Sequence, residues 1–77
     1  MSATHDRARA LLAEALALPV EAIADDASPE TLEAWDSLAH ARLVLAVEAA
    51  RGHALPPEAA LDLFSLPAIA SALDARA

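Results

Sequence analysis

The fold is decided by DSLAHARLVLAVEAARG, residues 36–52, which has the marks of one helix with a defined start and a defined end. Asp36 is a favourable N-cap, because its carboxylate accepts hydrogen bonds from the free N–H groups of a first helical turn. Gly52 is a favourable stop, because glycine readily adopts the left-handed conformation that follows many helices. Arg51 adds a positive charge at the negative end of the helix dipole. We therefore expect a helix from Ser37 to about Arg51.

An amphipathic helix and a long acidic connection precede this stretch. Apolar residues recur at three- and four-residue spacing from about Thr4 to Ala17, and Pro19 would end that helix. The connection from residue 19 to residue 36 holds half of the 12 acidic residues and no basic residue. A loop this long in a small domain is usually functional or packed on the core. We expect a short turn of helix near residues 20–24 and apolar anchors at Val20, Ile23, Leu32 and Trp35.

Two more helices are predicted after Gly52. Pro56-Pro57-Glu58 opens a short helix to about Leu63, because proline is favourable at the first position of a helix. Ser65 caps a last helix to about Ala75. With one glycine and an aromatic fraction of 3%, a sheet is disfavoured. The predicted fold class is all-α: one domain over residues 1–77, a small four-helix bundle of three main helices and one short helix, with a long first loop.

Charge and cysteine content disfavour several classes of partner and site. The net charge of −7 and pI of about 4.6 argue against nucleic acid or an anionic membrane as a partner. A chain with no cysteine has no disulfide framework, no thiolate metal site and no cysteine nucleophile. No apolar run approaches a membrane span, and residues 1–7 lead into a charged segment rather than a signal peptide. We expect a cytoplasmic monomer that meets basic patches on other proteins.

Ser37 is the candidate functional residue. A hydroxyl in the first turn of a helix lies beside free N–H groups and the positive end of the helix dipole, which is a favourable place for a phosphate ester. The alternative interpretation is that Asp36-Ser37 is only a capping device, because such pairs open many helices.

The helix that begins at Ser37 has two apolar sides. At about 100° per residue, Leu43, Val47 and Ala50 share the side expected to face the core. Leu38, Arg42, Leu45 and Ala49 form a nearly opposite stripe, which we interpret as a docking surface. The alternative is that the long loop buries this second side as well.

Trp35-Asp36-Ser37-Leu38, followed by Leu43 and the Val47-Glu48 pair, resembles the Asp-Ser-Leu signature of acyl carrier proteins. Asp-Ser-Leu alone is a weak signal, but at this position in a four-helix pattern it is a strong one. The resemblance covers nearly the whole chain, because four other features follow the family's order: the first helix, the acidic loop with Pro29, the Leu55-Pro56 step with the short helix to Leu63, and the Ser65-Leu66 start of the last helix.

In that family the serine carries a 4′-phosphopantetheine arm, attached by a phosphopantetheinyl transferase that uses coenzyme A. The resemblance implies that Ser37 is the covalent attachment site and that Asp36 belongs to the same site. It implies a stand-alone carrier, not an enzyme, that holds an acyl or aminoacyl group as a thioester. Its other partners would be a loading ligase and downstream acyl-transferring enzymes of a specialised biosynthetic pathway. Acyl carrier is favoured over peptidyl carrier, because Asp36 stands where peptidyl carriers more often have histidine.

The sequence departs from the family's pattern at several positions. Ala34 stands where a glycine is common, and Ala50-Arg51-Gly52 stands where an aromatic residue is common. Arg42 replaces an acidic residue usual in fatty-acid carriers, which indicates dedicated partners. The alanine-rich core indicates a short acyl, hydroxyacyl or aminoacyl cargo. The expected partner-docking residues are Leu38, Arg42, Leu45 and Glu48.

Other functions are disfavoured or stay open. His40 follows Ser37 by three residues, but a catalytic pair also needs a third orienting group and an oxyanion site, and the sequence indicates neither. Metal binding is disfavoured because His5, His40 and His53 are scattered. An unmodified helical interaction domain of the same fold stays open as the alternative.

Overall fold

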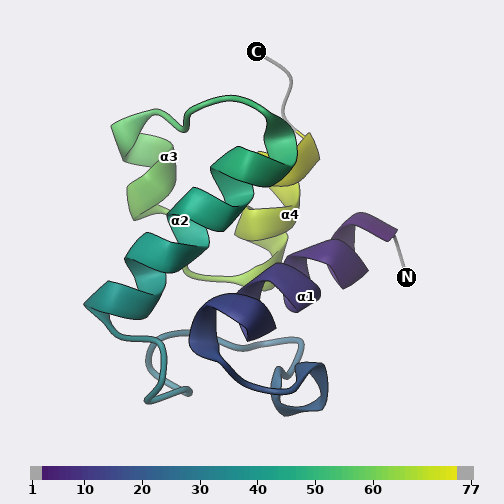
Figure 1. The fold of residues 1–77 in the computed structure, drawn as a ribbon. Helices are drawn as coiled ribbons and strands as arrows, with labels where there is room; N and C mark the ends of the chain where they lie inside the picture. The colour runs from purple at the N-terminus through teal and green to yellow at the C-terminus, as the bar shows by residue number, and fades with distance from the viewer. Residues whose placement is uncertain (1–2, 75–77) are drawn as a thin grey trace.

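The computed structural model describes residues 3–74 of the 77-residue chain, and every regular element in that range is helical. Within the same range no helix is both long and apolar enough to cross a lipid bilayer. The predicted all-α class, with three main helices and one short helix, is confirmed. In chain order the elements are α1 (Ala3–Leu16), the 3₁₀ helix η1 (Val20–Ala22), α2 (Ser37–Arg51), α3 (Pro57–Leu61) and α4 (Leu66–Asp74), shown in Figure 1.

The core lies between α1, α2 and α4, which pack against one another. Alanines occupy many of its positions, and their small side chains let the helix axes approach closely. The large side chains are few, so each one carries a large share of the apolar burial. Those with at most 2% of their surface exposed are Leu12, Leu43, Val47, Leu63, Leu66 and Ile69.

α2 begins and ends at the predicted residues. Asp36 is its N-cap, with an extended backbone and a side chain that accepts a hydrogen bond from the Ala39 N–H. Gly52 ends it in the left-handed region at φ 81°, and the Gly52 N–H donates to the Glu48 carbonyl. Nothing lies within 4 Å of the position that a Cβ on Gly52 would take, so glycine is favoured there by its backbone conformation alone.

α1 ends one residue before the predicted end, and it ends by a different device from the one expected. Ala17 has a left-handed backbone at φ 57°. The Ala17 N–H donates to the Glu14 carbonyl at 3.2 Å and the Leu18 N–H donates to the Ala13 carbonyl at 2.9 Å. This pair of bonds is a Schellman motif, in which glycine usually occupies the left-handed position. Here alanine occupies it, so the chain has already turned out of the helix before it reaches Pro19.

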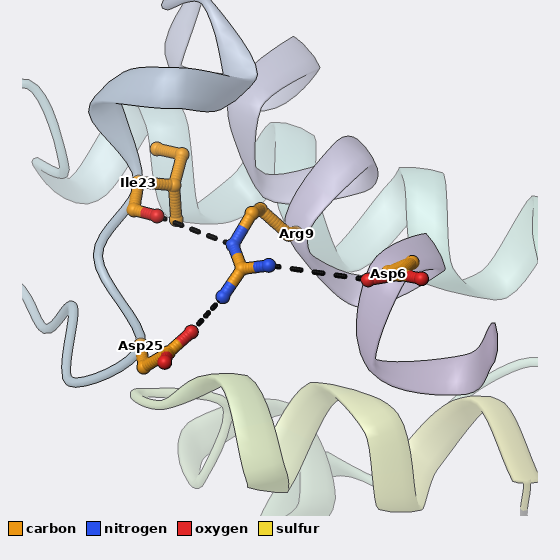
Figure 2. A network of polar contacts seen from close by, with 4 residues as sticks. All are labelled: Asp6, Arg9, Ile23 and Asp25. Atoms are coloured by element: carbon orange, nitrogen blue, oxygen red, sulfur yellow. Dashed lines mark hydrogen bonds and ion pairs between the residues drawn. The ribbon is translucent and has the colours of Figure 1, made fainter. Parts of the chain in front are cut away.

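Arg9 fastens the long first connection to α1 (Figure 2). Its Nε donates to the Ile23 carbonyl at 3.2 Å, and its guanidinium also pairs with Asp25. A third, longer contact joins it to Asp6 at 4.0 Å. The arginine side chain is 16% exposed and Asp25 is 84% exposed. The arginine therefore depends on these hydrogen bonds more than Asp25 does, because a largely buried charge is costly without partners.

The connection crosses the end of the bundle where α1 ends and α2 begins (Figure 1). Of its four predicted anchors, Ile23 and Trp35 are buried and Leu32 is partly buried. Val20 is 39% exposed, which corrects the expectation for that residue, because η1 turns this side chain outward.

α3 is shorter than predicted, and α4 begins where predicted. α3 ends at Leu61 rather than near Leu63, because the chain leaves the helix there and turns Leu63 into the core, where it is 2% exposed. Ser65 caps α4 as predicted, since its Oγ accepts a hydrogen bond from the Ala68 N–H at 3.2 Å. The predicted end near Ala75 lies just outside the described residues.

Candidate functional site

Ser37 is the first residue of α2, and its side chain is exposed. The Asp36 carboxylate accepts from the Ala39 N–H at 2.9 Å, and the Asp36 carbonyl accepts from the His40 N–H at 2.9 Å. Among the described residues, the Ser37 hydroxyl and the N–H groups of Ser37 and Leu38 have no hydrogen-bond partner. The serine hydroxyl therefore stands beside two free donors at the positive end of the α2 dipole.

Trp35 anchors the chain directly before this site. It is 4% exposed, and its Nε1 donates a hydrogen bond to Nδ1 of His40 at 3.1 Å. Since Nδ1 accepts this bond, the ring proton of His40 belongs on Nε2, which lies 2.8 Å from the Ala60 carbonyl and donates to it. His40 thus links Trp35, two residues before α2, to Ala60 in α3.

The same histidine is the centre of a stack of three rings. The Trp35 and His40 rings lie 6.3 Å apart with 22° between their planes. The His40 and Phe64 rings lie 4.8 Å apart with 24° between their planes. The stack joins the start of α2 to the turn between α3 and α4, so three separate segments hold the backbone around Ser37 in place.

A pocket of about 360 Å³ opens directly beside Ser37. A second pocket of about 330 Å³ adjoins it and shares Pro29 and Phe64 with it. The lining of the first pocket is Pro29, Trp35, Asp36, Ser37, His40 and Phe64. The second adds Ser28 and Glu30. We call the two together the Ser37 groove.

The surface that leads to Ser37 along the chain is acidic. Every acidic residue of the first connection is exposed, and no basic residue lies between them in the sequence. Basic residues on a partner protein would favour its approach to Ser37 from this side. The acidic residues are Glu21, Asp25, Asp26, Glu30, Glu33 and Asp36.

The outer stripe of α2 is exposed, which removes the alternative that the loop buries it. Leu38 is 62% exposed, Leu45 is 66% exposed, and Arg42 and Ala49 are exposed between them. In the part of the chain that the structure describes, Arg42 forms no ion pair. Ala39, Leu43 and Val47 form the buried side, whereas Ala50, which was expected there, is exposed.

Glu48 has a structural contact that its sequence position did not indicate. One carboxylate oxygen accepts the Leu55 N–H at 2.7 Å, which ties the end of α2 to the segment after Gly52. The Glu48 side chain is partly buried, whereas those of Leu38 and Leu45 are exposed. Its predicted part in docking stays a prediction.

His40 is not arranged as a base for Ser37. Both of its ring nitrogens are engaged, one by Trp35 and the other by the Ala60 carbonyl. His53 is exposed after α2, and the side chain of His5 lies outside the described residues. The described residues include no group of three His, Cys, Asp or Glu side chains that could hold a metal ion.

Sequence reasoning placed Ser37 and Asp36 but missed Trp35–His40–Phe64 as a unit. The signal was weak, because these three residues follow no helical or strand period. Only the single tryptophan before the helix and the single phenylalanine after α3 mark them in the sequence.

No protein-family model matches the sequence, and no curated protein matches it. The resemblance to acyl carrier proteins therefore depends on the residues quoted above, and function has to be inferred from the site and not from relatives.

Proposed function

We propose that this chain is an acyl carrier protein with 4′-phosphopantetheine attached to Ser37 by a phosphopantetheinyl transferase. The observation that carries the proposal is the position of Ser37: an exposed hydroxyl on the first residue of α2, directly after the capping residue Asp36. The order of the four helices around it supports the same proposal.

The site fits a phosphate ester. The free N–H groups of Ser37 and Leu38 are suitable donors to phosphate oxygens, and the helix dipole favours negative charge there. Asp36 is turned to the Ala39 N–H, so one of its oxygens is already occupied. Because no described side chain is hydrogen-bonded to the Ser37 hydroxyl, the base that removes its proton belongs to the transferase.

The arm supplies a terminal thiol that holds an acyl group as a thioester. The chain itself supplies the attachment point and the recognition surface. Asp36 keeps the start of α2 in place, and its free oxygen is open to a metal ion or a basic group of the visiting enzyme. The exposed stripe of Leu38, Arg42 and Leu45 is the surface for the loading ligase and for enzymes that receive the acyl group.

Core packing favours a short cargo. The large side chains between α1, α2 and α4 are almost fully buried, and Leu43 and Val47 on α2 are 0% exposed. A long acyl chain would have to displace such side chains, which interiors at crystal-like density resist. The favoured cargo is a short acyl, hydroxyacyl or aminoacyl group.

The alternative function is an unmodified interaction domain of the same fold. The exposed leucines of α2 favour it, because two large apolar side chains on one exposed helix face also suit a docking module without an arm.

Intact mass separates the two functions. The protein is incubated with coenzyme A and a broad-specificity phosphopantetheinyl transferase, alongside Ser37→Ala and the control Ser71→Ala, which removes another exposed hydroxyl. A carrier gains one phosphopantetheinyl group in the wild type and in Ser71→Ala, and none in Ser37→Ala. A wild-type protein that gains no mass is an interaction domain.

A further inference from the structure

The Ser37 groove has an unusual lining for the surface of an acidic protein. Its open apolar surface comes from the rings of Phe64 and Pro29, whereas Trp35 is 4% exposed and lies behind His40. Phe64 is 46% exposed, and only one of its faces is covered by His40, so apolar surface remains open to a ligand. Among the residues that the structure describes, no lysine or arginine lines either pocket of the groove.

The lining selects the chemistry of an occupant. Apolar ring faces favour methyl and methylene groups. The carboxylates of Asp36 and Glu30 disfavour an anionic ligand, since like charges repel when no cation offsets them. An anionic cargo is therefore a poor occupant, and a neutral group with branched methyls and a few polar atoms is a good one.

Ser37 itself lines the groove, so whatever is attached to Ser37 has the shortest path into it. We propose that the groove holds the pantoyl portion of the arm, the neutral part next to the phosphate with two methyl groups on one carbon. This rests on the proposed attachment at Ser37. The methyl groups lie against Phe64 and Pro29, and the arm continues towards Ser28 and Glu30.

This position gives the arm a defined direction. The outer stripe of Leu38, Arg42, Leu45 and Ala49 lies on α2, whereas the groove passes between the first connection and the turn before α4. A partner docked on the stripe therefore leaves the arm's path uncovered. Binding in the groove also limits the volume the arm explores, because a tethered ligand has a high effective concentration at a nearby site.

The experiment uses the modified protein, labelled with ¹³C and ¹⁵N, and an unlabelled arm. Isotope-filtered NOE spectra then record which protein protons lie near the two methyl groups of the arm. We expect NOEs to the ring protons of Phe64 and Pro29. The variant Phe64→Ala should lose the Pro29 NOEs and give methyl shifts like those of free pantetheine. Leu61→Ala is the control, because Leu61 is 68% exposed and lines neither pocket; it should keep the wild-type NOEs.

The outcomes are distinguishable. Intact mass first tells whether the arm is attached: a protein that gains no mass overturns both the proposed function and this inference. A modified protein with no methyl NOEs to Phe64 and Pro29, or with NOEs to Leu38 and Leu45 instead, overturns this inference alone. The same holds if Phe64→Ala, with amide spectra that show a folded chain, keeps the Pro29 NOEs.

Discussion

Leu43 and Leu45 separate the buried side of α2 from its exposed stripe. They are two residues apart on one helix, yet Leu43 is 0% exposed and Leu45 is 66% exposed. Leu43→Ala removes atoms from the centre of the bundle and leaves a cavity, so we expect it to lower the free energy of unfolding by about 2–5 kcal/mol. A domain of this length has a total of roughly 4–12 kcal/mol. The single truncation therefore removes a large part of the stability.

Leu45→Ala makes the same chemical change on the exposed stripe. The side chain already keeps two thirds of its surface in water, so its loss should cost less than about 1 kcal/mol. Thermal unfolding followed by circular dichroism measures both variants. At about 4–8 °C per kcal/mol, Leu43→Ala should melt at least ~8 °C below the wild type, and Leu45→Ala only a few degrees below it.

The same pair tests the docking surface. Leu45→Ala should slow transfer of the carried group to a partner enzyme while its melting temperature stays close to that of the wild type. If Leu45→Ala is as destabilising as Leu43→Ala, the stripe is part of the core and its interpretation as a docking surface is refuted. If it is stable and transfers at the wild-type rate, Leu45 takes no part in docking.

Three more variants test other features. Arg9→Met keeps the apolar stem but loses the hydrogen bond to the Ile23 carbonyl, so it should lower the free energy of unfolding in urea by about 1–2 kcal/mol. Asp25→Asn changes an exposed partner and should lower it by less than about 1 kcal/mol. Equal losses would show that the ion pair dominates. Ala17→Gly should stabilise the protein by about 1 kcal/mol and Gly52→Ala should destabilise it by a similar amount, because both positions have positive φ; shifts of the same sign in thermal unfolding would refute this. Arg42→Glu should speed loading by a generic fatty-acid enzyme that prefers acidic carriers and slow loading by the native partner. The reason is that charge at an interface affects the rate of encounter and the rejection of wrong partners. Unchanged rates with both enzymes would show that Arg42 has no part in partner selection.

Local signals predicted α2 well because its ends are determined locally. Asp36 and Gly52 act within a few residues of themselves, through one carboxylate and one left-handed backbone. The end of α1 was less predictable. Pro19 suggested where the helix must stop, but the chain leaves it earlier through Ala17, a residue type that rarely adopts this conformation and so gives no signal in the sequence.

The site was predictable only in part, for a similar reason. Ser37 and Asp36 are adjacent in the sequence and belong to a recognisable pattern. Trp35, His40 and Phe64 meet through tertiary packing, and Phe64 comes from the turn after α3. No periodic pattern in a sequence indicates that a turn residue packs over the first turn of another helix. The groove beside Ser37 therefore could not be predicted and was found only in the structure.

Peptide mapping locates the phosphopantetheine arm that we propose on Ser37. After treatment with coenzyme A and the transferase, a glutamate-specific protease that cuts after Glu33 and Glu48 releases the peptide of residues 34–48. Ser37 is the only hydroxyl side chain in that peptide. We expect this peptide to carry the whole mass gain, with one phosphopantetheinyl group. An unmodified 34–48 peptide, with the added mass on any other peptide or on none, would contradict it.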